Sequence, residues 1–186
     1  MSQKQMETFQ KLFGALVKLA QEKAISEIRV VDIAKTAGVH RATFYRHVED
    51  AQDLLERGTE YFWNDLLASM EEVRVETSGL HTHSAVPQYL QHFFRKILEN
   101  SDVFKAFLYQ ESSNYFQTHM RKRMVDFVAK YRLVYIGDEK HKHHLAAMIS
   151  ASLFATIEFV VKHGSYEPYL STYYSFVKRE NKLDYV

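Results

Sequence analysis

The sequence predicts an all-α protein, and two observations carry that prediction. The 186 residues include only two prolines and six glycines, so long stretches run without a residue that breaks a helix. Within those stretches the apolar residues recur at spacings of three and four, and strict alternation is rare. Apolar residues make up 46% of the chain and charged residues 25%, which is typical of a globular protein with a substantial core.

The N-terminal third divides into four helices. Apolar residues of the first lie on one stripe, Gly38 ends the second because glycine takes a positive φ easily, and Asp50 caps the fourth. The expected segments are a helix over Gln3–Lys23, a link over Ala24–Arg29, a helix of about two turns from Val30 to Ala37, a short helix over His40–His47 and a long helix over Ala51–Glu76.

The remainder predicts further helices separated by short breaks. We expect a loop at Leu80–Ser84 and Pro87 in the first turn of a helix that ends near Asn100. The following helices are expected at Asp102–Gln110, Ser113–Val134 and Glu139–Lys162, with a last helix from the turn at Pro168 to about Arg179. We find no repeat and no linker, so residues 1–50 and 51–186 are expected to be two functional domains joined at a long helix.

The absence of cysteine excludes disulfide scaffolds, thiolate metal sites and thiol catalysis. The first residues lack the apolar core of a signal peptide, and the apolar run Leu145–Val161 is shorter than the ~20 residues that span a bilayer. We therefore expect a cytoplasmic protein with no membrane partner. We also expect no enzyme, because no Glu-x-x-His pair, Gly-x-Ser-x-Gly motif or phosphate loop occurs.

The N-terminal segment is basic and carries a helix-turn-helix pattern. Residues 1–48 contain eight Lys/Arg and four Asp/Glu, whereas the rest of the chain contains sixteen and nineteen, an asymmetry that favours a polyanionic partner. A small residue, a turn glycine and an apolar plug stand at Ala34, Gly38 and Val39, as a steep helix crossing requires. The outer face of the second helix is then free to enter a major groove.

The residues on and beside that face fall into two groups. Those suited to base edges are Arg41 or Arg46, by bidentate bonds to guanine, and Ala42 or Thr43, by contact with a thymine methyl, and His40 lies on the same face. Those better placed for phosphates, which position a protein on DNA, are Arg29, Lys35, Tyr45 and His47. We expect the partner to be a double-stranded DNA operator.

At residues 6–67 the chain resembles the N-terminal domain of the TetR/AcrR family of regulators. The resemblance rests on Asp32–Val39, on Thr43–His47 and on the spacing to Asp53-Leu54-Leu55. It implies about nine helices, of which three bind DNA and the rest bind an effector and form a homodimer on a palindromic operator. Arg29, Val31, Val48 and Ala51 depart from residues frequent in that family, which changes expected contacts but not the fold.

The C-terminal region is dense in aromatic residues, eleven of the chain's 26 lying between Tyr89 and Tyr135. Aromatic residues at helical spacing are usually core, but aromatic-lined cavities also hold small organic ligands, and the resemblance implies such a pocket. The candidate effector residues are Phe93, Phe94, Phe107, Tyr109, Tyr115, Phe116, Phe127 and Tyr131. The effector itself stays open, and a protein partner that makes the chain an activator is the alternative to a small molecule that releases a repressor.

The apolar helix after residue 139 carries small residues that permit close helix packing. The resemblance assigns this helix and the last one to a four-helix dimer interface, although burial within one subunit explains the same pattern. The candidate interface residues are Met148, Ala151, Ser152, Ala155, Phe159, Tyr169, Tyr173 and Phe176. The histidines at 81, 83, 141, 143 and 144 lack a completing carboxylate or thiolate, so we expect neither a metal nor another cofactor.

Overall fold

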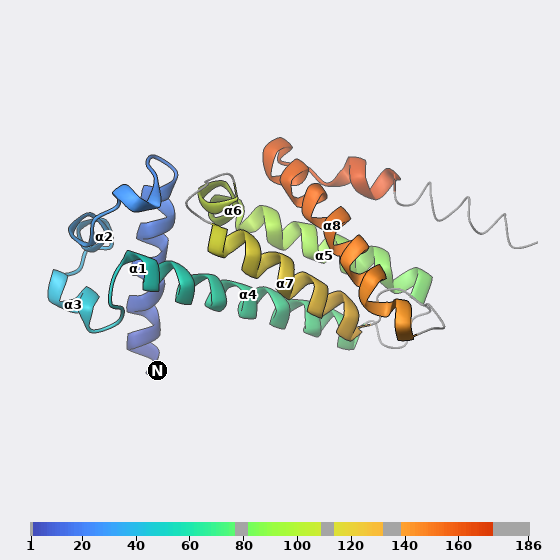
Figure 1. Cartoon of the computed structure of the whole chain (residues 1–186), viewed down its shortest axis with the longest axis horizontal. Helices are drawn as coiled ribbons and strands as arrows, with labels where there is room; N and C mark the ends of the chain where they lie inside the picture. Colours follow the sequence, from blue (N-terminus) through green and yellow to red (C-terminus); the bar gives the residue numbers. More distant parts are fainter. Residues whose placement is uncertain (1, 77–81, 109–113, 132–138, 173–186) are drawn as a thin grey trace, which may run out of the picture. The chain divides into compact units, whose positions relative to one another are not determined.

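The structure is a computed structural model that describes residues 2–76, 82–108, 114–131 and 139–172. These residues contain α-helices, one 3-10 helix and no strand, which confirms the all-α prediction (Figure 1). The α-helices are α1 (Gln3–Ala20), α2 (Val30–Thr36), α3 (Arg41–Tyr45), α4 (Ala51–Glu76), α5 (Thr82–Glu99), α6 (Ser101–Phe107), α7 (Asn114–Tyr131) and α8 (Glu139–His163), with the 3-10 helix at Ile25–Glu27. Residues 167–172 are also helical.

One helix start differs from its prediction. The proline at 87 was expected in a first turn after a loop at Leu80–Ser84, but α5 already begins at Thr82. Pro87 is therefore the sixth residue of the helix, where its missing N–H leaves the carbonyl of His83 without the usual partner. The prediction relied on the preference of proline for the first turn and was wrong, because a helix can lose one backbone hydrogen bond near its end and still form.

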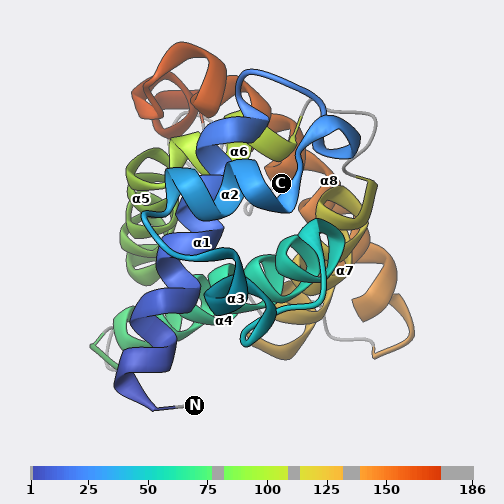
Figure 2. The same ribbon diagram turned by 90° about the vertical axis from the view of Figure 1, so that its left-hand side faces the viewer.

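The described residues form two compact units. The first comprises residues 1–65 and 101–124. In it α1 packs against α2 and α6, and α2 packs against α3. Helices α1, α2 and α3 face the viewer in Figure 2. Its buried core includes Phe9, Leu12, Phe13, Leu16, Ile33, Ala34, Phe44, Leu54, Leu55, Trp63, Phe104, Phe107, Phe116 and Met120.

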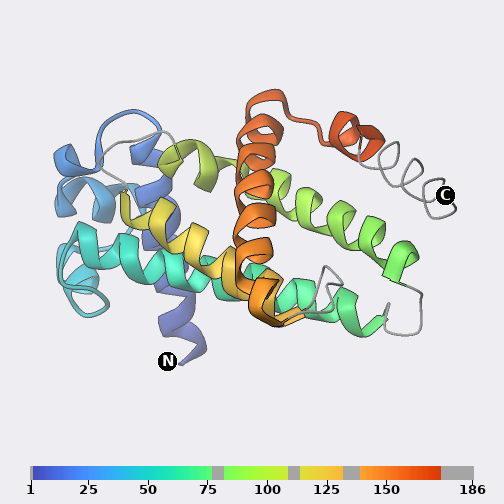
Figure 3. The same cartoon turned by 45° about the vertical axis from the view of Figure 1, so that its right-hand side comes forward.

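The second unit comprises residues 66–100 and 125–186. In it α5 packs against α8, which crosses it in Figure 3. The Phe94 ring lies 5.0 Å from the ring of Tyr169 and 6.1 Å from that of Tyr166, centroid to centroid. These packing units do not test the functional boundary expected at residue 50, which stays a prediction.

Candidate nucleic-acid interface

The turn between α2 and α3 is fixed by Gly38. Its φ of 68° lies in the left-handed region, which costs glycine little. The Val39 N–H donates to the Ala34 carbonyl at 2.9 Å, and the Gly38 N–H donates to the Lys35 carbonyl at 3.2 Å. This pair of bonds is the Schellman motif, which satisfies the last carbonyls of a helix. The turn predicted from the sequence is therefore a defined corner and not a loose loop.

The start of α2 is held by Asp32. Its carboxylate accepts the Arg29 backbone N–H at 3.4 Å, so Asp32, and not the Arg29 side chain, satisfies the helix start. The same oxygen lies 3.1 Å from Lys23 Nζ and 3.4 Å from Arg29 Nε. The hydrogen bond from Lys23, aided by that from Arg29, holds the pKa of Asp32 below its usual range. The carboxylate thus stays charged and ties the residues after α1 to α2.

The far end of α3 is anchored to α4. Phe44 and Val48 are buried, as predicted. The Asp50 side chain accepts the Asp53 N–H at 2.8 Å and caps α4, also as predicted. Arg57 of α4 donates to the His47 carbonyl and lies 3.6 Å from the Asp53 carboxylate. The chain leaving α3 is therefore bonded to a long helix, which fixes the orientation of the exposed face.

The structure leaves most of the predicted DNA residues accessible. Two of them, Thr43 and His47, are half-buried, and the others are exposed: Arg29, Lys35, His40, Arg41, Ala42, Tyr45 and Arg46. From residue 29 to residue 47 there are four Arg/Lys side chains and a single carboxylate, that of Asp32, which is already paired. The accessible charge on this segment is therefore positive, as an interface with phosphate requires.

Arg41 of α3 and Arg46, directly after α3, are positioned by hydroxyl groups. Arg41 Nη2 donates to the Tyr45 hydroxyl at 3.0 Å, and the guanidinium carbon lies 5.4 Å from the centre of the Tyr45 ring. Arg46 Nη2 donates to Thr43 Oγ1 at 3.2 Å. Both contacts restrain a long side chain on an exposed face, and a restrained arginine loses less entropy when it binds a base edge or a phosphate.

A shallow groove of about 610 Å³ lies beside this face. It brings together Arg29, Arg41 and Tyr45, which the sequence placed at the interface, with residues from the start of α4. Its lining is Ile25, Ser26, Ile28, Arg29, Val30, Val31, Arg41, Tyr45, Asp50, Ala51 and Gln52. The start of α2, the exposed side of α3 and the start of α4 therefore share one concave surface.

Three polar residues in or near this groove were not predicted from the sequence. Ser26 and Gln52 carry polar groups into the groove, and Arg57 holds the carbonyl of His47. The i,i+4 spacing of Asp53 and Arg57 is a sequence signal for a helical ion pair, but the reach of Arg57 to residue 47 is visible only in three dimensions. Burial, together with Arg46 and Arg57, lowers the pKa of His47, so its ring is neutral at pH 7.

The candidate effector residues fall in different places. Phe107 and Phe116 are buried in the first unit, with ring centres 5.5 Å apart, and Tyr115 is half-buried there and stacks on His119. Phe93, Phe94 and Phe127 belong to the second unit, where Phe127 stacks on Tyr89 at 6.1 Å. Tyr109 lies outside the described residues, and so does the side chain of Tyr131. The predicted pocket stays a proposal.

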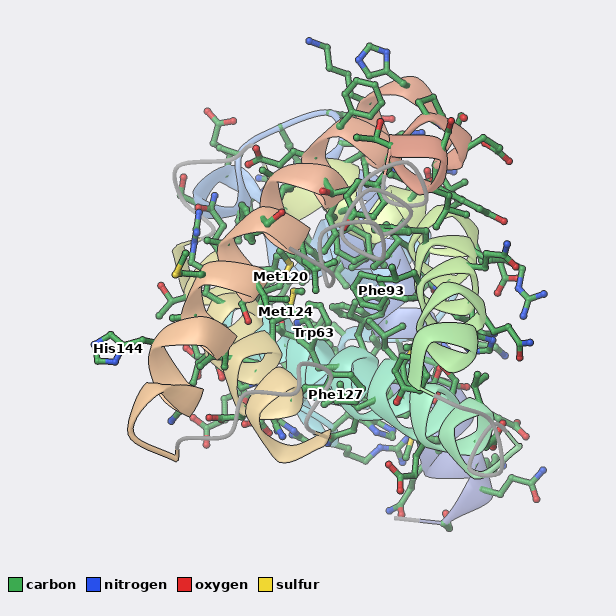
Figure 4. The ribbon with its side chains drawn as sticks, turned by 90° about the vertical axis from the view of Figure 1, so that its right-hand side faces the viewer. Trp63, Phe93, Met120, Met124, Phe127 and His144 are labelled. Carbon is green, nitrogen blue, oxygen red and sulfur yellow. The ribbon has the colours of Figure 1, made fainter. Side chains whose placement is uncertain are left out.

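The candidate dimer residues of α8 share one exposed face. The side chain of Met148 is 69% exposed and that of Phe159 is 45% exposed, and Ala151, Ser152 and Ala155 between them are exposed too. His144 also projects away from the helix (Figure 4). Tyr169 instead packs on Phe94 of its own chain, while Tyr173 and Phe176 lie outside the described residues. An apolar stripe on one side of a helix is the arrangement that helix-to-helix packing covers.

The same helix is long and apolar enough to cross a membrane by length and composition alone. The window Ala146–His163 has a mean hydropathy of 1.3, and 44% of it is buried inside the structure. A helix in the core of a protein that crosses no membrane can give the same values, and a single such helix is weak evidence for a span.

Comparison with known proteins finds similar solved structures but no similar family model or curated sequence. No protein-family model matches the chain, and no curated protein matches it significantly. A putative TetR-family transcriptional regulator from Syntrophomonas wolfei has a similar structure, with a TM-score of 0.73 and 17% identity over 93% of this chain and 94% of that one. The dihydroxyacetone kinase operon activator DhaS gives a TM-score of 0.63 and 19% identity over 95% and 97%.

A transcriptional regulator of the same family from Aquifex aeolicus gives a TM-score of 0.59 and 17% identity over 95% of this chain and 98% of that one. At these identities the likeness concerns the fold, and it extends over nearly the whole of each chain. It agrees with the resemblance that the residues 32–47 show in the sequence. The chain therefore has the fold of the TetR/AcrR family of transcriptional regulators.

Proposed function

We propose that the protein is a sequence-specific DNA-binding regulator of transcription that acts in the cytoplasm. The observation that carries this proposal is the exposed cationic face of α3, with Arg41 held by Tyr45 and Arg46 held by Thr43. Its neighbours Arg29 and Lys35 extend the face for phosphate contacts. The fold shared with known regulators supports the same conclusion.

In this proposal the exposed side chains of α3 enter the major groove of an operator. Arg41 and Arg46 have the donor geometry for guanine, while Ala42 and Thr43 offer methyl groups to thymine. Lys35, Tyr45 and neutral His47 contact the backbone, His47 through a hydrogen bond and not through charge. The groove lined by Arg29, Ser26 and Gln52 adds polar groups that can contact the phosphate backbone of the DNA.

We further propose that the protein acts as a homodimer joined through the exposed face of α8. Met148 and Phe159 are large apolar side chains that a second copy would remove from water, and the small residues between them allow two helices to approach closely. The DNA-binding segments of the two copies, related by a two-fold axis, would then bind a palindromic operator. Its half-sites would lie one helical turn, about 34 Å, or a multiple of it apart.

A ligand regulates DNA binding if it binds more tightly to a dimer conformation with one distance between the two DNA-binding segments than to a conformation with another. We propose a repressor that a small-molecule effector releases from its operator. The second candidate is an activator that depends on a protein partner, and the observation that favours it is the structural likeness to DhaS, which is described as an operon activator.

The test is selection of DNA by the purified full-length protein from sheared genomic fragments, followed by sequencing. We expect one enriched inverted repeat, and fragments carrying it should bind much more tightly than scrambled controls at moderate salt. The absence of any enrichment at low salt by a folded dimer would contradict the proposal. A ligand-induced thermal shift supports the effector-released repressor, whereas DNA binding or activation only in the presence of a partner supports the activator.

A further inference from the structure

The short helix α3 depends on its two ends for its direction. A helix of five residues has little stability of its own, so neighbouring segments must hold it. The turn at Gly38 fixes the start, and residues 46–50 connect the end to α4. The buried side chains of Phe44 and Val48 anchor this end by apolar packing, which is not directional. Hydrogen bonds to the backbone are directional, so those to residues 46–50 decide the angle of the helix.

Two side chains of α4 bind the backbone of this connection. Asp53 accepts the Glu49 N–H at 2.9 Å, and Arg57 donates through Nη1 to the His47 carbonyl. The same Nη1 lies 3.6 Å from Oδ2 of Asp53, one turn earlier on α4. An ion pair on α4 therefore binds one N–H and one carbonyl of the connection, on either side of the buried Val48.

Arg57 also contacts α1. Its guanidinium carbon lies 5.4 Å from the centre of the Phe9 ring, at a distance where a cation and an aromatic face attract each other. The side chain thus touches α1, the end of α3 and α4, and all three belong to the first unit. With Phe9 and Asp53 restraining the guanidinium, its bond to the His47 carbonyl has a defined direction. The planar fork of an arginine can serve a carboxylate and a carbonyl at once, which the single ammonium of a lysine does less well.

We propose that Arg57 is a positioning residue for DNA recognition, which acts through the His47 carbonyl to hold α3 at the angle where its exposed side chains meet base edges. Arg57 itself does not contact the DNA. This inference rests on the proposed function, because it takes α3 as the helix that enters the major groove. Base-edge hydrogen bonds need an exact angle, whereas a phosphate contact tolerates a small rotation. Loss of Arg57 should therefore weaken selective binding more than non-selective binding.

The imidazole of His47 gives a second readout, in the absence of DNA. Burial, together with the charges of Arg46 and Arg57, lowers the pKa of His47. Removal of the Arg57 charge should raise the pKa of His47, and the Asp53 carboxylate, then without its arginine, acts in the same direction. A variant that keeps a positive charge at position 57 should leave this pKa low.

Three variants of the full-length chain test the proposal. Arg57→Met keeps an apolar stem beside Phe9 but removes the charge and all donors. Arg57→Lys keeps the charge with a single donor group. Arg95→Met is the matched control, because Arg95 also lies beside a glutamate four residues later, 3.9 Å from Glu99, and beside a histidine, but in the second unit.

The DNA measurement is titration of the selected operator and of a scrambled duplex of equal length at several salt concentrations. Arg57→Met should bind the operator about tenfold more weakly, as loss of a charged hydrogen bond does, and the scrambled duplex about twofold more weakly or less. The salt slope should stay unchanged, because no phosphate contact is lost. Arg57→Lys should recover part of the operator affinity, and Arg95→Met should match the parent on both duplexes.

The measurement without DNA is an NMR titration of the His47 ring in the free protein, with the signal assigned from its loss in His47→Ala. Its midpoint should rise in Arg57→Met and stay at the parental value in Arg57→Lys and Arg95→Met. Thermal unfolding checks that each variant is folded at the temperature of the titrations. If Arg57→Met does not fold, Arg57→Lys carries the same comparison of the two duplexes with a smaller expected loss.

Two results would overturn the inference. An equal loss on both duplexes with a salt slope lower by about 1 means that Arg57 contacts a phosphate directly. Parental operator affinity in a folded Arg57→Met means that the bond to the His47 carbonyl is not needed, and the proposed function then stands without it. If the parent itself selects no operator, the proposed function fails, and the His47 titration still reports whether Arg57 acts on the end of α3.

Discussion

The Phe13 ring of α1 lies directly against Gly58 of α4. A Cβ placed on Gly58 would stand 2.0 Å from Phe13 Cδ2 and 2.2 Å from Cε2, far inside van der Waals contact. The Phe13 ring also stacks on the ring of Phe107, with centres 6.1 Å apart. The glycine is therefore a packing requirement at the place where the first helix meets α4.

Substitution of Gly58 by alanine should destabilise the protein. Alanine favours a helix by about 1 kcal/mol over glycine, but a Cβ forced into a packed ring costs roughly 1–3 kcal/mol. We expect the clash to dominate, because Phe13 is buried and also packs on the buried ring of Phe107. Urea unfolding of Gly58→Ala should show a lower free energy of unfolding, and Phe13→Leu in the same chain should recover part of it.

Gly14 provides the matched control. It also lies within a helix, but a Cβ there would meet nothing within 4 Å. Gly14→Ala should therefore raise the free energy of unfolding by roughly 0.5–1 kcal/mol. If both alanine variants were stabilised equally, the close approach of Phe13 to Gly58 would be wrong.

The turn glycine makes a different prediction, because a Cβ on Gly38 would meet nothing within 4 Å. The cost of Gly38→Ala is then purely that of a positive φ, roughly 1–2 kcal/mol. Gly38→Asn should lose less, since asparagine tolerates this conformation better. Thermal unfolding of the two variants checks the order, and an alanine variant as stable as the parent would contradict the left-handed turn.

How far the sequence alone leads can be seen from these positions. The corner at Gly38, the burial of Phe44 and the cap at Asp50 were predictable, because each depends on residues within a few positions of one another. The contact of Phe13 with Gly58 joins residues 45 positions apart, and no local pattern specifies it.

The aromatic residues teach the same lesson. Neighbours in the sequence separate in space, since Phe93 and Phe94 pack in one unit whereas Phe104 and Phe116 pack around Trp63 in the other. Helical spacing tells which residues are buried but not against which partner. The packing of Phe104 and Phe116 on Trp63 was therefore not predictable from the sequence.

On DNA, Arg41→Ala should relax the preference at one base position and cost about 1–3 kcal/mol there. Lys35→Ala should weaken binding to all sequences and lower the salt slope by about 1, as a lost phosphate contact does. Titration of the selected operator and its point variants at several salt concentrations measures both. Lys105→Ala, which removes an exposed lysine of α6, is the control and should change neither quantity.

Tyr45→Phe keeps the ring under Arg41 but removes the hydroxyl that Arg41 contacts and that we assign to the phosphate backbone. Binding to all sequences should weaken by a similar factor, and we expect His47→Ala to do the same without changing the salt slope, because His47 is neutral. If Tyr45→Phe, His47→Ala and Arg41→Ala all leave affinity unchanged at moderate salt, the assigned DNA face is wrong.

Stability should fall as the solution becomes mildly acidic. Burial lowers the pKa of His92 and of His119, and in each case an arginine adds to the effect. Arg95 Nη2 lies 2.9 Å from Nδ1 of His92, and Arg123 Nε donates to Nε2 of His119 at 3.3 Å, so each ring must accept as a neutral imidazole does.

Since these folded-state pKa values lie below the unfolded value of about 6.5, the unfolded chain binds protons first as the pH falls. The free energy of unfolding should therefore be constant at neutral pH and decrease below about pH 6.5. His92→Gln should make this decrease shallower. A Tm that stays level or rises between about pH 7 and pH 5.5 would show that these histidines are not held neutral.

The exposed face of α8 predicts the oligomeric state. A carboxylate at Met148 or Phe159 would be buried without a partner if these side chains meet a second copy. We expect Met148→Glu and Phe159→Glu to raise the dimer dissociation constant by about thirtyfold or more, as loss of a central interface residue does. Sedimentation velocity over a concentration series measures the change, and Gln91→Glu, which adds the same charge on an exposed position of α5, should leave the dimer intact. Monomers in the unmodified protein would contradict the proposed dimer. Dimers unaffected by both α8 variants would show that the interface does not include this face of α8.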